Sequence, residues 1–252
     1  MHDIIDLKHH ATYGLSVCGM TFGDFEVEGA NFADDDLSGV ILRKIKFKHC
    51  SFSKTSLSSA ELTECTFVEC DLEETAFRGA IFDQVTFCDC AMEGATFQNA
   101  DFESVFMQEC RGRVNFSHVD CNAGTSFVHC KFWQSSAIDT NFDNVYFLQT
   151  DLSELSVSSE TSIFKTEFES CDLTNCKFIE TKRVEEAIFK NCTVSPFLRP
   201  MKRKLKQVDF PISKSKGSAY FPEASRVSNP YRNVSFCAHL ECSSVEEFRA
   251  VT

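Results

Sequence analysis

Residues 60–79 read AELTECTFVECDLEETAFRG, and every fifth residue in them is large and apolar: Leu62, Phe67, Leu72 and Phe77. Beyond this segment, the same spacing holds without interruption from Phe22 to Met107. An α-helix repeats every 3.6 residues and a strand every 2, so neither element explains the pattern. The spacing predicts a chain that turns a corner every five residues and winds into a solenoid.

A second position of the period, two residues before each large one, holds small side chains. In the quoted segment these are Ala60, Cys65, Cys70 and Thr75. Nine of the fourteen cysteines fall in this position, where they alternate with alanine, threonine and valine. Such interchange is typical of small buried side chains. We therefore expect reduced, structural thiols and not a disulfide framework or a set of metal ligands.

The complete five-residue pattern is small, polar or acidic, large apolar, polar, polar, as in Ala30-Asn31-Phe32 and Ala100-Asp101-Phe102. It resembles the pentapeptide repeat family, and the resemblance covers residues 15–194. It implies an all-β fold, a right-handed quadrilateral β-helix (a pentapeptide repeat solenoid) in which four pentapeptides form one square coil. Coils would stack at the strand spacing of about 4.8 Å, which predicts seven to eight coils and a column roughly 35 to 40 Å long.

The residues expected to fill the column are mostly phenylalanines at the large position and cysteines at the small one. Because these positions hold the coils together, we expect no catalytic role for them. They are Phe22, Phe32, Phe47, Phe52, Phe67, Phe77, Phe82, Phe87, Phe97, Phe102, Phe127, Phe132, Phe142, Phe147, Phe168, Phe178, Cys50, Cys65, Cys70, Cys90, Cys110, Cys130, Cys171 and Cys176.

Three irregularities interrupt the period. One residue is lost near Arg111-Gly112-Arg113 and regained near Ala123-Gly124, where glycine suits an unusual turn. One residue is gained between Ser158 and Ser162, and another near Thr181-Lys182-Arg183. These slips are either accommodated insertions or projections that contact a partner.

The first slip supplies candidate interaction residues. Arg111 and Arg113 flank its glycine. Trp133, the single tryptophan, follows an inward Phe132 and should therefore face outward. An exposed tryptophan is typical of a contact surface.

The two ends depart from the period. Residues 1–14 are predicted to be an N-terminal cap. All five prolines fall after Val194, and proline cannot donate to a sheet ladder, so residues 195–252 are predicted to be a basic cap or tail. Apolar spacing after Pro200 and a capping pattern near Ser243 predict two short helices, which would make this C-terminal cap partly helical.

One basic tract stands in that C-terminal segment. Its members are Lys202, Arg203, Lys204 and Lys206. The tract is either the solvated face of a capping helix or a patch for targeting or binding.

Charge divides at the same boundary. Residues 195–252 hold ten Lys or Arg and five Asp or Glu, a net charge of +5. Since the whole chain carries −12, residues 1–194 carry −17. An acidic column argues against direct binding to nucleic acid or to an anionic membrane. The sequence has no charged-then-apolar leader and no apolar run of roughly 18 residues, so we expect a cytoplasmic protein without a membrane span.

Motifs for catalysis and cofactor binding are missing from the sequence. There is no Gly-x-Ser-x-Gly, no phosphate-binding loop, no His-Glu-x-x-His and no dinucleotide fingerprint. Cys237, His239 and Cys242 lie close together, but three candidates without a second pair do not make a structural zinc site. We predict no catalytic residues, no metal and no cofactor.

The sequence therefore predicts a non-enzymatic protein–protein interaction module, an acidic rod that is a monomer or a homodimer and binds a protein partner of unknown identity. The resemblance implies an alternative, because some pentapeptide repeat proteins are similar to B-form DNA in width and charge. Those proteins bind DNA gyrase or topoisomerase IV and protect against quinolones or other topoisomerase poisons. This chain departs from them in its long basic tail. A third alternative is a bacterial effector acting on a host protein.

Overall fold

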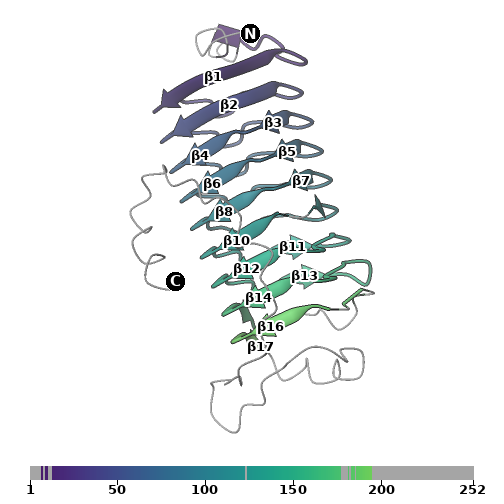
Figure 1. Cartoon of the computed structure of the whole chain (residues 1–252). Helices are drawn as coiled ribbons and strands as arrows, with labels where there is room; N and C mark the ends of the chain where they lie inside the picture. Colours follow the sequence, from purple (N-terminus) through teal and green to yellow (C-terminus); the bar gives the residue numbers. More distant parts are fainter. Residues whose placement is uncertain are drawn as a thin grey trace. The chain divides into compact units, whose positions relative to one another are not determined.

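The computed structural model describes residues 7, 9, 10, 13–122, 124–176, 181, 183, 184 and 186–194 of the 252-residue chain. Within these residues the chain forms short strands that are joined by tight corners (Figure 1). The strands are β1 (Thr21–Glu28), β2 (Ile41–Lys48), β3 (Glu61–Thr63), β4 (Thr66–Val68), β5 (Ile81–Asp83), β6 (Thr86–Cys88), β7 (Asp101–Glu103), β8 (Phe106–Gln108), β9 (Asp120–Cys121), β10 (Ser126–Val128), β11 (Ser136–Ala137), β12 (Tyr146–Leu148), β13 (Ser156–Val157), β14 (Glu167–Glu169), β15 (Asp172–Leu173), β16 (Ile188–Lys190) and β17 (Thr193–Val194).

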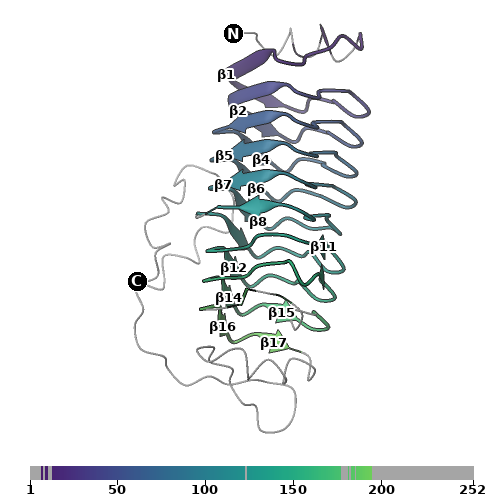
Figure 2. The same ribbon diagram turned by 90° about the vertical axis from the view of Figure 1, so that its right-hand side faces the viewer.

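All strand pairs are parallel, and each strand pairs with the equivalent segment of the next coil. The largest sheet has thirteen strands in the order β16-β14-β12-β10-β8-β6-β4-β2-β3-β5-β7-β9, with β1 paired to β2. Two smaller sheets pair β11 with β13 and β15 with β17. The long strands β1 and β2 each cover two sides of a coil, which is why two ladders join into one sheet (Figure 2). This is the right-handed quadrilateral β-helix that the sequence predicts.

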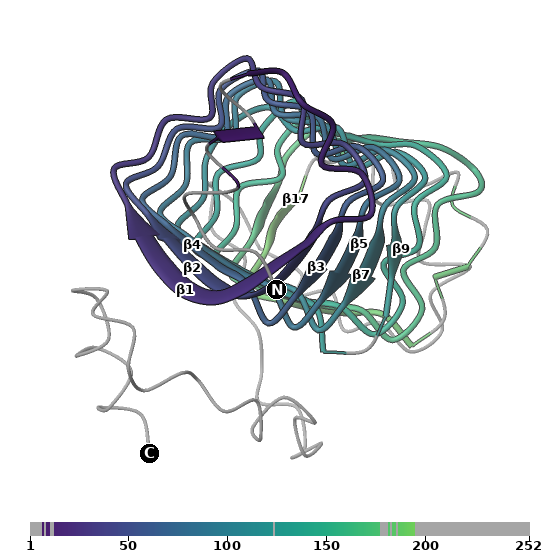
Figure 3. The same ribbon diagram turned by 90° about the horizontal axis from the view of Figure 1, so that it is seen from above.

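Each coil has four sides, which we name after one strand on each. The β4 side carries the inward Phe67 and Phe87, and the β3 side carries Leu62 and Phe82. The β15 side holds Leu173 and its equivalents at 20- or 21-residue intervals, and the β11 side holds Ala137 and its equivalents. Figure 3 is a view down the stack of coils, and it shows that successive coils surround a common interior.

The strand register confirms the slips that the sequence predicts. Regular coils advance by twenty residues, as in the pairing of Leu62 with Phe82. Phe102 instead pairs with Cys121, nineteen residues on, because one residue is lost at the first slip. Phe147 pairs with Phe168, and Phe168 with Phe189, each twenty-one residues on, because each of the two later slips adds one residue. The ladders therefore absorb all three irregularities without breaking.

Each corner places one residue in the left-handed backbone region. Lys54, Glu74 and Asn99 have φ values of 59°, 54° and 59°, and the same position recurs about every five residues. This region costs an L-residue roughly 1–2 kcal/mol and is worst for β-branched side chains. None of the described non-glycine residues at positive φ is Val, Ile or Thr. The corner position is thus filled by glycine and by residues whose single Cβ substituent tolerates the turn.

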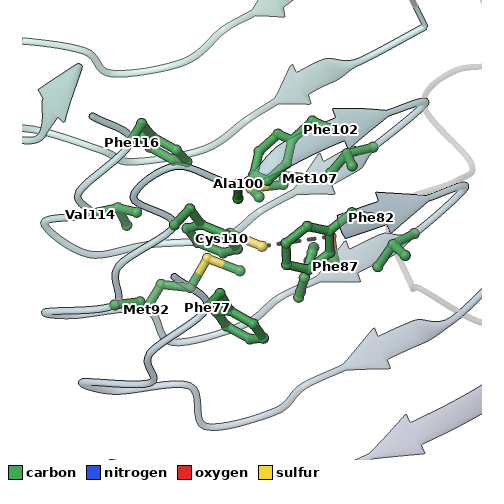
Figure 4. Packing of buried hydrophobic residues seen from close by; sticks show 14 of the residues in the cluster. Phe77, Phe82, Phe87, Met92, Ala100, Phe102, Met107, Cys110, Val114 and Phe116 are labelled. Carbon is green, nitrogen blue, oxygen red and sulfur yellow. Dashed lines mark hydrogen bonds between the residues drawn. The ribbon is translucent and has the colours of Figure 1, made fainter. Parts of the chain in front are cut away.

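The interior is a continuous column of stacked phenyl rings. On the β4 side the rings of Phe67 and Phe87 stack with centroids 4.9 Å apart and an interplanar angle of 12°. On the β11 side Phe77 and Phe97 stack at 4.8 Å and 8°. Rings on adjacent sides meet edge to face, as Phe97 and Phe102 do at 5.4 Å. Figure 4 shows this packing around Phe77, Phe87 and Cys110. Stacking at the strand spacing satisfies offset aromatic geometry and strand pairing together.

The structure places the predicted core residues inside this column. Every one of them that it describes is buried, at 4% exposure or less, and Phe178 lies outside the described residues. At the first coil, Leu7 is fully buried in the same cluster as Val17. Residues 195–252, with the predicted cap, helices and basic tract, also lie outside the described residues. No helix in the described part of the chain has the length and apolar character to cross a membrane.

Candidate interaction surfaces

A carboxylate cluster covers the outside of the β3 side from β3 to β9. Its members are Glu61, Glu64, Asp83, Asp101, Glu103 and Asp120. Strand pairing places Asp83 opposite Glu103, and Asp101 opposite Asp120, so their Cα atoms lie one strand spacing apart, about 4.8 Å. The outward positions of this side hold no Lys or Arg between residues 61 and 122. Because like charges repel at this spacing, the cluster favours a cationic partner.

Ile81 lies in the middle of the carboxylate cluster. It lies in the same row as Glu61 and Asp101, and its side chain is 47% exposed. In the described chain only two other large hydrophobic residues, Tyr13 and Leu15, are similarly exposed to solvent. Among the described residues, one cation, Lys44, is paired with the cluster, and it lies at the Glu64 edge. Lys44 Nζ lies 3.8 Å from Glu64 Oε1, and Asn141 Nδ2 donates to Asp120 Oδ1 at 2.6 Å. The centre thus combines an exposed apolar side chain with carboxylates that no described cation pairs.

The predicted candidates at the first slip gather on the β15 side. Arg111 pairs with Lys131 in the strand register, which brings Arg111, Arg113 and Trp133 onto neighbouring coils. Both arginines are engaged with the preceding coil: Arg111 Nη1 lies 3.2 Å from Asp89 Oδ1, and Arg113 Nε donates to Glu93 Oε1 at 2.5 Å.

These ion pairs limit what the slip residues offer a partner. The arginine side chains remain 59% exposed, and Trp133 is half-buried and not fully exposed. Exposed ion pairs of this kind contribute about 1 kcal/mol or less, so they position the arginines more than they stabilise the coil. The basic residues Lys202, Arg203, Lys204 and Lys206 lie outside the described residues.

The thiols form a column of their own along one corner of the β4 side. Cys50, Cys70, Cys90, Cys110 and Cys130 occupy the same position in five successive coils and are free and buried. Burial raises the pKa of the Cys90 and Cys110 thiols well above the usual range. Since the thiolate is the reactive form, these thiols are structural. Cys18 at the first coil is exposed.

The described residues offer few features for binding a small molecule or a metal ion. A shallow hollow of about 420 Å³ opens at the first coil, lined mainly by small side chains such as Ser38, Gly39 and Ser58. No group of three or more His, Cys, Asp or Glu within the described chain is placed to hold a metal ion. The outward surfaces of the column are therefore the main candidates for function.

Comparison with known proteins agrees with the coil geometry. Residues 40–113 match the family model described as the pentapeptide repeat region. These residues form a pentapeptide repeat region. No curated protein sequence matches it significantly.

Several solved structures of pentapeptide repeat proteins are similar to this chain. HetL, a pentapeptide repeat protein involved in heterocyst differentiation regulation from the cyanobacterium Nostoc sp. strain PCC 7120, is 16% identical with a TM-score of 0.36; the match covers 76% of this chain and 88% of HetL. Full-length QnrB1, a plasmid-mediated fluoroquinolone resistance protein, is 18% identical with a TM-score of 0.37 over 73% of this chain and 98% of QnrB1. Rfr23 from the cyanobacterium Cyanothece 51142 is 15% identical with a TM-score of 0.21 over 62% of this chain and 99% of Rfr23.

Sequence reasoning missed how the outward residues of the pentapeptide repeats gather by side. It treated them as one acidic exterior, whereas the carboxylates around Ile81 concentrate on the β3 side. It also missed that outward residues on the β4 side, such as Phe106 and Leu148, are apolar. The signal was available, because residues twenty apart in a regular column become neighbours on the same side. Reading the sequence in steps of twenty and not only five would have revealed both groups.

Proposed function

We propose that this pentapeptide repeat protein is a non-enzymatic interaction module that binds a basic protein surface through the carboxylate cluster on its β3 side. The observation that carries the proposal is the set of six carboxylates around the exposed Ile81, with no cation among the outward positions of that side from residue 61 to residue 122. A cationic partner would relieve the repulsion within the cluster, and Ile81 would supply apolar contact at its centre.

Rigidity supports the same role. The backbone on the β3 side is held by hydrogen bonds between coils, such as those from the Ile81 amide to the Ala60 carbonyl and from the Asp101 amide to the Ala80 carbonyl, at 2.9 and 3.0 Å. The positions of the carboxylates are therefore fixed before a partner arrives. A preorganised surface loses less conformational entropy on binding than a mobile one.

The test compares three baits in affinity capture from lysate of the source organism. The first is the unmodified chain, the second carries Glu61→Gln, Asp101→Asn and Glu103→Gln, and the third is a matched control that removes three charges from other surfaces. We expect the partner to be retained by the unmodified chain and lost, by about tenfold or more, from the second bait.

The control bait carries Glu73→Gln, Glu74→Gln and Glu154→Gln, all exposed on the β15 side and its corners. It should retain the partner as the unmodified chain does. Equal retention by all three baits, or equal loss from both variants, would contradict a binding site on the β3 side.

A second candidate function is mimicry of DNA towards a type II topoisomerase, and charge spacing favours it. Six carboxylates between Glu61 and Asp120 span three coil steps, or about one charge per 2.4 Å of column. Double-stranded DNA carries about one charge per 1.7 Å. A gyrase supercoiling assay with and without ciprofloxacin tests this candidate. No effect of micromolar protein would rule it out, and a true mimic should lose its effect when the three β3-side carboxylates are neutralised.

A further inference from the structure

One outward row on the β15 side changes the sign of its charge halfway along. It contains Arg111, Lys131, Asp151 and Asp172, which pair one with the next in four successive coils. We call these four residues the mixed-charge row. Neighbouring members are one strand spacing apart, about 4.8 Å, so two cations are followed by two carboxylates within about 14 Å of column. The row therefore has a positive half and a negative half.

This order of charges makes the row complementary to itself. A two-fold axis that lies along the strands, midway between Lys131 and Asp151, brings the β15 side of a second, antiparallel copy against the first. Lys131 then lies opposite Asp151 of the second copy. In the next coils outward, Arg111 lies opposite Asp172 of the second copy. Because the axis repeats each pair, all eight charged side chains of the two rows face a charge of opposite sign.

Most of the mixed-charge row is unpaired within one molecule. Among the described residues only Arg111 of the row is in an ion pair, in which its Nη1 lies 3.2 Å from Asp89 Oδ1. The two carboxylates of the row are nevertheless held in place. Asp151 accepts a hydrogen bond from the Ser153 amide at 2.9 Å, and Asp172 accepts one of the same length from the amide two residues on. They are thus oriented before a cation of a second copy arrives, which lowers the entropy cost of association.

The second outward row of the β15 side fits the same axis. Trp133, two residues after Lys131, is half-buried and lies opposite Ser153 of the second copy, whose small side chain leaves room for the indole. Arg113 lies opposite the uncharged Thr174 of the second copy. Within these four coils, neither row of the described chain places like charges opposite each other. The two-fold axis therefore satisfies both rows at once.

We propose that the β15 side forms an isologous, antiparallel contact with the β15 side of a second copy of this chain, centred between Lys131 and Asp151. In each coil the chain passes along the β15, β11, β3 and β4 sides in that order, so the β3 side lies opposite the β15 side. Both carboxylate clusters proposed for partner binding therefore stay exposed, and the dimer does not depend on that binding. Because the contact covers only one side of four coils, the dimer is weak.

Analytical ultracentrifugation of the intact chain is the first test. At about 0.15 M salt, where repulsion between the two acidic columns is screened beyond about 8 Å, sedimentation should fit a monomer–dimer equilibrium. The dimer should be populated by a protein concentration of about 1 mM. Emission of Trp133, the single tryptophan, should shift to shorter wavelength over the same concentrations, because the contact covers its indole. A chain that stays monomeric at about 1 mM, or that assembles beyond a dimer, would overturn the proposal.

Charge exchange within the row identifies the contact. Arg111→Glu with Lys131→Glu makes the row wholly negative, and Asp151→Lys with Asp172→Lys makes it wholly positive. Each variant alone should dimerise about tenfold more weakly or worse, because like charges then face each other. An equimolar mixture of the two should form a heterodimer at least as tightly as the unmodified chain. Failure of the mixture to associate would overturn the proposal.

A matched control reverses two charges on the opposite side of the column. Glu61→Lys with Asp101→Lys should leave the dimer unchanged, although it should abolish capture of the partner proposed for the β3 side. Loss of the dimer in this control would overturn the proposal, as would unchanged dimerisation of both row variants, because the contact would then lie on another surface. Failure of the proposed function alone would appear as a dimer that captures no partner.

Cross-linking gives a second measurement that needs no substitution. Zero-length carbodiimide coupling of a mixture of isotope-labelled and unlabelled chain should join Lys131 to Asp151 in products that combine one labelled and one unlabelled peptide. Links of Lys131 only within one molecule, or links between molecules that involve only other sides of the column, would overturn the proposal even if a row variant failed to fold.

Discussion

The Cys110 thiol donates a hydrogen bond to the carbonyl oxygen of Phe87, 3.6 Å away and twenty-three residues earlier (Figure 4). The same bond recurs along the corner, for example from Cys130 Sγ to the Met107 carbonyl at 3.4 Å. At the next coil Thr150 takes over, and its hydroxyl donates to the Phe127 carbonyl at 3.2 Å. The small inward residue thus fills space beside the phenyl stack and also ties each coil to the one before it.

Substitution at Cys110 should separate these two roles. Cys110→Thr keeps a donor and a similar volume, as Thr150 does in the same column, and should change the free energy of unfolding by about 1 kcal/mol or less. Cys110→Leu removes the donor and overfills the corner, so it should destabilise by about 1–3 kcal/mol. Urea unfolding of the two variants measures the difference. Equal stability of the Leu and Thr variants would argue against a tightly packed corner.

Stability should fall as the pH rises above 9. Burial raises the pKa of the Cys65 thiol to about 11 and that of the Cys176 thiol to about 12, from 9.0. Between pH 9 and 11 the unfolded chain loses the Cys65 proton while the folded chain keeps it. The stabilisation is therefore complete below pH 9 and is lost as the pH rises towards 11, by about 1.4 kcal/mol per pH unit for one proton.

A matched variant isolates this effect. Val85 occupies the position of Cys65 in the next coil, so Cys65→Val should pack there without a titratable group. Urea unfolding at several pH values should show a shallower loss of stability between pH 9 and 11, by up to the slope of one proton. An unchanged slope would mean that Cys65 keeps an ordinary pKa in the folded chain.

Gly112 should not tolerate a side chain. Its φ is +142°, and a Cβ atom there would lie 2.4 Å from the backbone nitrogen of Glu93. Gly112→Ala should therefore destabilise by about 2 kcal/mol or more. Gly29 at φ +64° has no heavy atom within 4 Å of the same position, so Gly29→Ala should cost only about 1 kcal/mol. Thermal unfolding compares them, and similar losses would show that strain at Gly112 comes from the backbone angle alone.

Asp143 should stabilise the coil that the slip between Ser158 and Ser162 lengthens by one residue. Its carboxylate accepts hydrogen bonds from the Phe164 amide at 2.9 Å and from the Ser162 hydroxyl, and it lies 2.9 Å from Arg183 Nη1. Asp143→Ala leaves these donors without an acceptor and should cost about 1–3 kcal/mol. Asp143→Asn keeps an oxygen and should cost less, because Arg183 is largely exposed. Hydrogen exchange at the Phe164 amide should rise in the Ala variant; unchanged exchange would contradict this role.

Much of the fold follows from counting residues. The period of five assigned Phe67, Phe87 and Cys110 to the interior because a corner every five residues leaves only two inward positions. The slips were also predictable, since each changes the count by one and the ladder keeps its register around them. The corner residue was harder to recognise, because it is filled by polar residues of either charge, such as Lys54 and Glu74, and polar residues also occupy the other outward positions. Its requirement is a backbone angle, which residue type reflects only weakly.

The candidate surfaces depended on the tertiary structure. The sequence showed that residues 1–194 are acidic, but the gathering of Asp83 with Glu103 around Ile81 depends on a coil of twenty residues. Arg111 was predicted to be a contact residue from its place beside a slip, and only the fold shows that it is paired with Asp89.

The sequence by itself determined what lies inside this protein, because burial selects residue type at every inward position and the selection repeats along the chain. The tertiary structure decided what lies side by side on the outside. Ile81, for example, is 47% exposed and lies in the same ladder as Glu61 and Asp101, which are twenty residues before and after it. Neighbours on the surface are twenty residues apart in the chain, and the electrostatic and apolar contacts between them exist only after the coils have stacked.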